Sequence, residues 1–162
     1  MDIFLLPGAY FVGDHRHRIR TLLGSCVSIT LWHPGCRVGA MSHFLLSSRV
    51  PVERGNCCAP DPRYAEEALA LMLDGLKQLG VPYRQCQAKI FGGGEMFPHV
   101  RSAASQGVGR KNGESARRLL EAHQIAVLSE SLFGHGHRRI VFDVANGDVW
   151  SHQVDPAIVR PS

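Results

Sequence analysis

Two extended, apolar-rich runs joined by a tight turn constrain the fold of this chain most. Residues 19–32 end in an alternating stretch, with Val27, Ile29 and Leu31 on one face and Cys26, Ser28 and Thr30 on the other. Alternation of this kind is typical of a half-buried strand. A turn signal follows at residues 33–36 (HPGC), and residues 37–46 form the second run. The pattern predicts an antiparallel hairpin.

Helical periodicity appears twice in the rest of the chain. After a loop rich in Pro, Gly and Ser at residues 47–62, Asp61 is a candidate cap and Pro62 a candidate first helical residue. The positions expected to face inward on this helix are Ala65, Ala68, Leu69, Met72, Leu76 and Leu79, before Gly80 and Pro82 end it. A second helix is expected after a capping Asn112, with Ala116, Leu119 and Leu120 facing inward.

Further strands complete the predicted architecture. They are expected near residues 86–91, running into Gly92–Gly94, near residues 125–130, and on both sides of Asn146-Gly147, a dipeptide typical of two-residue hairpin turns. Seven or so strands with two helices predict an α/β fold of layered mixed and antiparallel sheets, with the two main helices packed on one side. Nothing repeats and no linker interrupts the chain, so residues 1–162 are expected to form a single domain.

Composition excludes several classes of protein. No run approaches the roughly 20 apolar residues of a membrane span, and Asp2 stands where a secretory leader would carry basic residues, so a cytoplasmic protein without membrane insertion is expected. Five cysteines, two of them adjacent at Cys57-Cys58, indicate reduced thiols. A net charge of +4 on scattered residues argues against nucleic-acid binding. The histidines at 15, 17, 135 and 137 lack ligand partners at a recognised spacing, so no metal is expected.

The hairpin itself suggests a reactive pair. With a turn centred between Pro34 and Gly35, paired residue numbers sum to 69, which places Cys26 directly opposite His43 on one face. An imidazolium beside a thiol stabilises the thiolate and can later return a proton. Amide groups near Gly24-Ser25 would then lie close to a developing oxyanion. The alternative is that Cys26 is a small core residue and His43 is structural.

Several motifs in order along the chain resemble the CheD family, the chemoreceptor glutamine deamidases of bacterial chemotaxis. The segments that carry the resemblance are residues 21–28 (TLLGSCVS), 38–46 (VGAMSHFLL), 89–97 (KIFGGGEMF) and 108–112 (VGRKN). The resemblance spans roughly residues 3–150. It implies hydrolysis of glutamine side chains on the cytoplasmic helices of receptors, with release of ammonia and without a metal or organic cofactor.

The resemblance also implies roles for individual residues. The family's nucleophile corresponds to Cys26 and its histidine to His43. Ser25, Gly24, Gly93 and Gly94 are candidate substrate-binding residues, since glycines let a backbone approach a ligand closely. A CheC-type phosphatase of the response regulator is a candidate partner.

One position departs from the family pattern. The third catalytic residue of the family is a threonine six positions before the cysteine, where this chain has Arg20, and Thr21 follows it. Strand parity would put Arg20 on the face of Cys26, whereas a bulge at residues 22–24 would bring Thr21 there instead. Arginine has no hydroxyl to orient His43, so we expect Thr21 to be the third catalytic residue. The alternatives are that the third group comes from elsewhere, or that the protein is a weakly active module that binds the phosphatase. A papain-like protease is a third interpretation.

Overall fold

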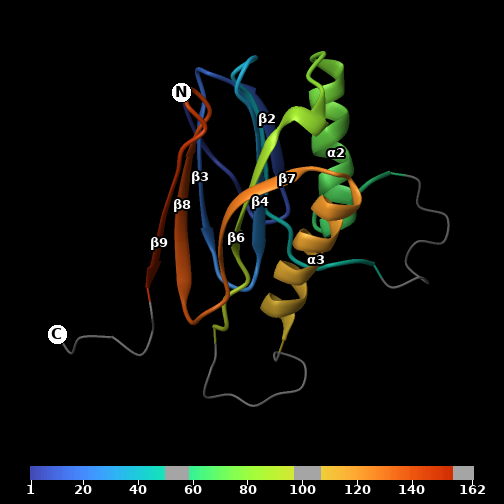
Figure 1. The fold of residues 1–162 in the computed structure, drawn as a ribbon. Coiled ribbons are helices and arrows are strands. Elements are labelled where there is room, and N and C mark those ends of the chain that lie inside the picture. The colour runs from blue at the N-terminus through green and yellow to red at the C-terminus, as the bar shows by residue number, and fades with distance from the viewer. Residues whose placement is uncertain (50–58, 97–106, 155–162) are drawn as a thin grey trace.

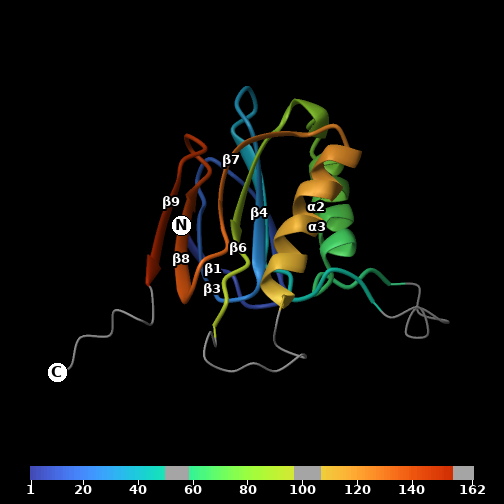
Figure 2. The same ribbon diagram turned by 60° about the horizontal axis from the view of Figure 1, so that its bottom comes forward.

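Three layers make up the described part of the chain, which comprises residues 1–49, 59–96 and 107–154 of a computed structural model. A central five-stranded sheet has the strand order β2-β5-β4-β6-β7, and an outer four-stranded sheet has the order β1-β3-β8-β9. The helices α2 and α3 cover the side of the central sheet that faces away from the outer sheet (Figure 1; Figure 2). The predicted α/β class, with layered sheets and two helices on one side, is confirmed.

The elements have the following bounds. The central sheet contains β2 (Tyr10–Asp14), β4 (Val27–His33), β5 (Val38–Ser42), β6 (Gln87–Gly92) and β7 (Ala126–Leu132). The outer sheet contains β1 (Asp2–Phe4), β3 (Arg18–Leu23), β8 (His137–Asp143) and β9 (Val149–Val154). The helices are α2 (Ala65–Gln78), α3 (Val108–Ala122) and the short 3-10 turn η1 (Tyr83–Gln85).

Two apolar cores flank β4. One face of the strand, with Val27, Ile29 and Leu31, packs under the helices. The opposite face looks into a second core between the two sheets, to which Ile19 and Phe142 of the outer sheet contribute. Because the outer sheet covers this second face, Ser28 and Thr30 are buried as well. The expectation of a half-buried strand is therefore wrong: β4 is buried on both faces.

The chain changes sheets between β3 and β4. β3 pairs with β1 and β8 in the outer sheet, whereas β4 pairs with β5 and β6 in the central sheet. The crossing occurs within the three residues from Gly24 to Cys26, where no strand is formed. What reads as one extended run in the sequence is thus two strands in different layers, and Cys26 lies at the end of the crossing.

The predicted hairpin between β4 and β5 exists, but its register differs from the prediction. Thr30 pairs with Met41 and His33 with Val38, so paired numbers sum to 71 and four residues form the turn. Arg37 closes the turn with a φ of 52° and donates its N–H to the His33 carbonyl at 2.8 Å. Cys26 is therefore not directly opposite His43. A shift of two residues keeps every side chain on its predicted face, because the side-chain period of a strand is two.

The helix boundaries also differ from the predictions. α2 begins at Ala65, three residues after Pro62, because the Asp61 carboxylate accepts hydrogen bonds from Arg63 instead of capping the helix. Leu79, expected to face inward, is 58% exposed just past the end of α2. α3 begins at Val108, so Asn112 is a buried residue inside the helix and not its cap.

The carboxyl-terminal hairpin is confirmed, but its turn is longer than the two residues that Asn146-Gly147 predicts. β8 pairs antiparallel with β9, and Gly147 in the turn has a φ of 82°. The Asp143 N–H donates to the Asp148 carbonyl at 2.9 Å, which leaves a four-residue loop between them. In the part of the chain described, no helix combines the length and apolar character needed to cross a bilayer.

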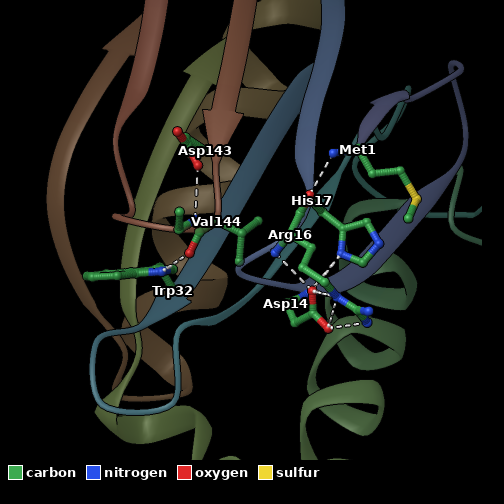
Figure 3. A network of polar contacts seen from close by, with 8 residues as sticks. Met1, Asp14, Arg16, His17, Trp32, Asp143 and Val144 are labelled. Carbon is green, nitrogen blue, oxygen red and sulfur yellow. Dashed lines mark hydrogen bonds and ion pairs between the residues drawn. The ribbon is translucent and has the colours of Figure 1, made fainter.

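Polar contacts tie the sheets together at the end of β4 that is remote from Cys26 (Figure 3). The indole N–H of Trp32 donates to the Val144 carbonyl at 2.8 Å, which links β4 to the segment after β8. Nearby, the amino-terminal group of Met1 donates to the Arg16 carbonyl at 2.7 Å, and Arg16 pairs with Asp14 at 2.9 Å. These contacts fix the two sheets at one end of the core between them, which we call the layer between the sheets. The candidate site lies at the other end of this layer.

Candidate active site

The side chain of His43 is fixed by a hydroxyl from the opposite sheet. Thr21 lies on β3, is buried, and places its Oγ1 2.7 Å from the His43 Nδ1 and 2.7 Å from the Leu5 carbonyl oxygen. A carbonyl oxygen can only accept, so the single Thr21 proton goes to Leu5. The Thr21 oxygen is then the acceptor for an N–H on Nδ1, and His43 keeps a free lone pair on Nε2.

Arg20 takes no part in this contact. β3 alternates between exposed and buried residues, and Arg20 lies on the exposed face with its guanidinium 3.5 Å from the Asp2 carboxylate. Parity counted from Cys26 would bring Arg20 inward only if one strand ran through both residues. Because the chain changes sheets at Gly24–Cys26, that count does not apply, and Thr21 is the residue beside the imidazole.

Cys26 reaches the same layer from the central sheet. Its side chain is partly exposed and packs against the core between the two sheets. Next to it, Val27 and Phe44 exchange backbone hydrogen bonds of 3.2 and 3.0 Å. This pairing makes Cys26 and His43 diagonal neighbours across the two segments, about 7–8 Å apart at the Cα level and within reach of a long side chain. The thiol, imidazole and hydroxyl therefore share one end of the layer between the sheets.

Burial sets the charge state of the Cys26 thiol and the His43 imidazole. Loss of solvation lowers the pKa of His43 from 6.5 to about 4, although the Leu5 carbonyl partly opposes this shift. Loss of solvation also raises the pKa of the Cys26 thiol, against a smaller opposing effect of its own backbone N–H. Both shifts favour the uncharged form. The resting pair at neutral pH is thus thiol and imidazole, rather than the thiolate and imidazolium that the sequence suggests.

A glycine turn clamps the segment that carries the thiol. Gly93 donates its N–H to the Cys26 carbonyl and Gly94 donates to the Gly24 carbonyl, both at 2.9 Å. Gly92 has a φ of 111°, and a Cβ on it would lie 2.2 Å from the Cys26 carbonyl oxygen. The amides of Gly93 and Gly94 are therefore occupied within the protein and hold the crossing segment in place.

A cavity of about 480 Å³ opens beside this turn. Ser25, Gly93 and Gly94 line it, together with the amino-terminal turn of α3 and the segment around Phe133. Gly24 does not line the cavity, and its backbone packs against the Met96 side chain instead. Cys26 is not a lining residue either, but it directly follows Ser25. The sequence identifies the glycines, whereas the contribution of Phe133 has no signal in a single sequence.

The other cysteines of the described residues lie apart from Cys26 and His43, whereas His135 lines the cavity. Cys36 is exposed and Cys86 is buried, and the Cys57-Cys58 pair lies outside the described residues. His135 lies 3.5 Å from the Glu95 carboxylate at the rim of the cavity. Within the described ranges, no three His, Cys, Asp or Glu side chains gather closely enough to hold a metal ion.

The fold and the candidate site define an α/β protein with two stacked sheets and with a cysteine, a histidine and a threonine at one end of the core between them. A family model described as CheD chemotactic sensory transduction matches residues 48–153. The chain belongs to the CheD family.

Relatives match over almost the whole chain. A protein of Albidiferax ferrireducens named probable chemoreceptor glutamine deamidase CheD 2 is 61% identical over 156 residues, which are 96% of this chain and 89% of that protein. Proteins named probable chemoreceptor glutamine deamidase from Chromobacterium violaceum and Pseudomonas savastanoi are 42% and 41% identical. These matches cover 96% and 98% of this chain, and 79% and 89% of the respective relatives.

Proposed function

We propose that this protein hydrolyses the side-chain amide of glutamine residues in chemoreceptors, giving glutamate and ammonia. The observation that carries the proposal is the 2.7 Å contact between Thr21 and the Nδ1 of His43, at the end of the layer where Cys26 also lies. The names of the relatives support the same activity. The receptor's cytoplasmic helices would be the substrate, which assigns the protein to the cytoplasm.

The reaction follows from the neutral resting pair. As the Cys26 sulfur attacks the amide carbon, its proton passes to the Nε2 of His43, and the carbonyl oxygen becomes an oxyanion. The protonated imidazole then gives this proton to the nitrogen, the carbon–nitrogen bond breaks, and ammonia leaves a thioester behind. A water molecule, deprotonated by His43, attacks the thioester carbon, and the proton returns to sulfur as glutamate is released. No cofactor enters these steps.

The backbone beside Cys26 supplies candidate donors for the oxyanion. Among the described residues, the Ser25 N–H has no acceptor, and the Cys26 N–H contacts only its own side chain. The N–H groups of Gly93 and Gly94 are already used, as described above. We therefore assign the stabilisation of the oxyanion to the N–H groups of Ser25 and Cys26. Gly93 and Gly94 would form part of the wall of the cavity that receives the substrate.

Incubation of purified receptor with the protein tests this proposal. Mass spectrometry of receptor peptides should find the small mass gain that exchange of NH₂ for OH produces at selected glutamines. The variant Cys26→Ala should produce none, and the matched variant Cys36→Ala should behave as wild type, because Cys36 is exposed and remote from His43. Persistent mass gain with Cys26→Ala would remove the thiol from the mechanism, and cleavage of receptor peptides would indicate a protease instead.

The binding-module alternative loses its main support. It rested on Arg20 in place of the catalytic threonine, and Arg20 lies on the exposed face of β3 while Thr21 contacts His43. A wild-type protein that binds a CheC-type phosphatase but leaves every receptor glutamine intact would restore that alternative.

A further inference from the structure

We infer that Asn112 is a positioning residue that orients the peptide bond between Ser25 and Cys26 for the proposed deamidation. Asn112 lies in α3 and is 1% exposed. Its Nδ2 donates to the Leu45 carbonyl at 2.8 Å and to the Ser25 carbonyl at 3.1 Å. Its Oδ1 accepts from the Ser47 hydroxyl at 3.2 Å. Three of the four hydrogen bonds that the amide can make are therefore formed.

The two carbonyls belong to the segments that carry the reactive side chains. Ser25 precedes the proposed nucleophile, and Leu45 is the cross-strand neighbour of Cys26 when the register of the Val27–Phe44 pair is extended by one residue. His43 lies two residues before Leu45 on the same segment. One side-chain amide thus fixes the spacing between the segment with the thiol and the segment with the imidazole.

The bond to Ser25 has a second consequence. The Ser25 carbonyl and the Cys26 N–H are part of one planar trans peptide unit, so they point in opposite directions. When Asn112 holds the carbonyl toward α3, the Cys26 N–H is directed away from the helix. This N–H is one of the two donors assigned to the oxyanion, and donors held in advance are what stabilises a developing negative charge.

Both the residue type and the closeness of the helix fit this role. Asn is unfavourable inside a helix relative to Ala, and a buried amide is costly unless it is hydrogen-bonded. Two carbonyl acceptors require two N–H groups, which the Asn amide supplies and a carboxylate does not. One turn earlier, a Cβ on Gly109 would lie 2.5 Å from the Gly93 carbonyl oxygen, so glycine allows α3 to approach near enough for Asn112 to reach Ser25.

This inference rests on the proposed function and predicts a specific kinetic signature. Asn112 does not line the cavity, so its loss should leave substrate binding nearly unchanged. The peptide unit and the neighbouring segment should lose their fixed orientation, and misplacement on the scale of 1 Å lowers rates by about a hundredfold. We expect Asn112→Ala to lower kcat by about this factor with little change in KM.

Full-length variants acting on purified receptor test the inference. Asn112→Ser retains one donor and should lose less kcat than Asn112→Ala; it also serves if Asn112→Ala does not fold. Leu120→Ala is the matched control. Leu120 is a buried residue of the same helix, so its replacement should destabilise the fold, but it makes no hydrogen bond to either carbonyl. Ser47→Ala removes only the partner of Oδ1 and should keep most of the activity. A folded Asn112→Ala protein with wild-type kcat, or an equal loss of kcat in Leu120→Ala, would overturn the positioning role.

A second readout separates this inference from the proposed function. Iodoacetamide labelling, followed by peptide mass spectrometry, gives the rate at Cys26 relative to the exposed Cys36 in the same molecule. Asn112→Ala should reduce this ratio at neutral pH, since His43 no longer lies where it can accept the thiol proton. An unchanged ratio contradicts the inference even if wild type shows no deamidation, whereas an inactive wild type with a reduced ratio contradicts only the proposed function.

Discussion

At the scale of single residues, the Thr21 hydroxyl controls which nitrogen of His43 carries the proton. Replacement by Val keeps the branched shape of the side chain and removes the 2.7 Å contacts to His43 and Leu5. We expect Thr21→Val to lower kcat about tenfold, the effect of losing one orienting hydrogen bond of about 1.5 kcal/mol, while Thr21→Ser stays near wild type. Steady-state deamidation kinetics provide the measurement.

The neighbouring residue offers a matched control for this prediction. Arg20 is on the same strand but lies on its exposed face beside Asp2. Arg20→Ala should therefore leave kcat unchanged. If Arg20→Ala reduced kcat and Thr21→Val did not, the assignment of the orienting group to Thr21 would be wrong.

The Cys26 thiol should titrate as a buried group before substrate binds. Because burial raises the pKa of this thiol, its thiolate forms only at a pH above the pKa of an ordinary cysteine, which is about 8.5. We expect the rate of Cys26 alkylation, followed by peptide mass spectrometry between neutral and alkaline pH, to keep rising beyond that value. A labelling rate that levels off below pH ~7 would show a stabilised thiolate and would contradict the neutral resting pair.

At the scale of secondary-structure elements, the crossing between β3 and β4 explains which features the sequence could predict. Alternation identified β4, and the prediction that Cys26 and His43 lie on the same face of the hairpin was correct, whereas β1 and β2 were not predicted. The register was not, because HPGC is compatible with both a two-residue and a four-residue turn, and only the closure by Arg37 decides between them. The family resemblance suggested Thr21 as the third residue of the site, but the strand pattern alone favoured Arg20, because the change of sheets at Gly24–Cys26 leaves no periodic signal.

The close approach of α3 to the glycine turn at residues 92–94 can be tested by a substitution at Gly109. Ala is favoured over Gly inside a helix by about 1 kcal/mol, yet a Cβ on Gly109 would lie 2.5 and 2.6 Å from the carbonyl oxygens of Gly93 and Gly94. Backbone oxygens cannot rotate away, so the clash should outweigh the helical gain. We expect Gly109→Ala to lower the free energy of unfolding by about 1–2 kcal/mol and to reduce deamidation further by moving Asn112.

A surface substitution on the same helix serves as its control. Lys111 is exposed two residues further along α3, and Lys111→Ala should leave both stability and activity near wild type in urea unfolding and receptor assays. If Gly109→Ala were more stable than wild type and fully active, the helix would have room to shift, and its close approach would not matter.

At the scale of the whole molecule, the site is buried because the outer sheet covers the face of the central sheet that carries it. The sequence motifs identify the thiol, the imidazole and the glycines, but charge states depend on this covering layer, which no local pattern reveals. The neutral pair follows from the stacking of two sheets, and the outer sheet is completed by β8 and β9, which are far from β3 in the sequence. Stability in acid should therefore report on the covering layer.

We expect acid to destabilise the fold through His43. In the unfolded chain His43 binds a proton below its ordinary pKa of 6.5, whereas in the folded protein it does so only below about 4. Between these values the unfolded state holds more protons, so stability falls as the pH falls, by roughly 3 kcal/mol in total. Urea unfolding at pH values between these two pKa values should show this slope in wild type and lose it in His43→Gln, whereas His135→Gln, at an exposed position, should retain it. Parallel curves for wild type and His43→Gln would mean that the imidazole is solvated in the folded protein, and that the layer between the sheets does not keep it neutral.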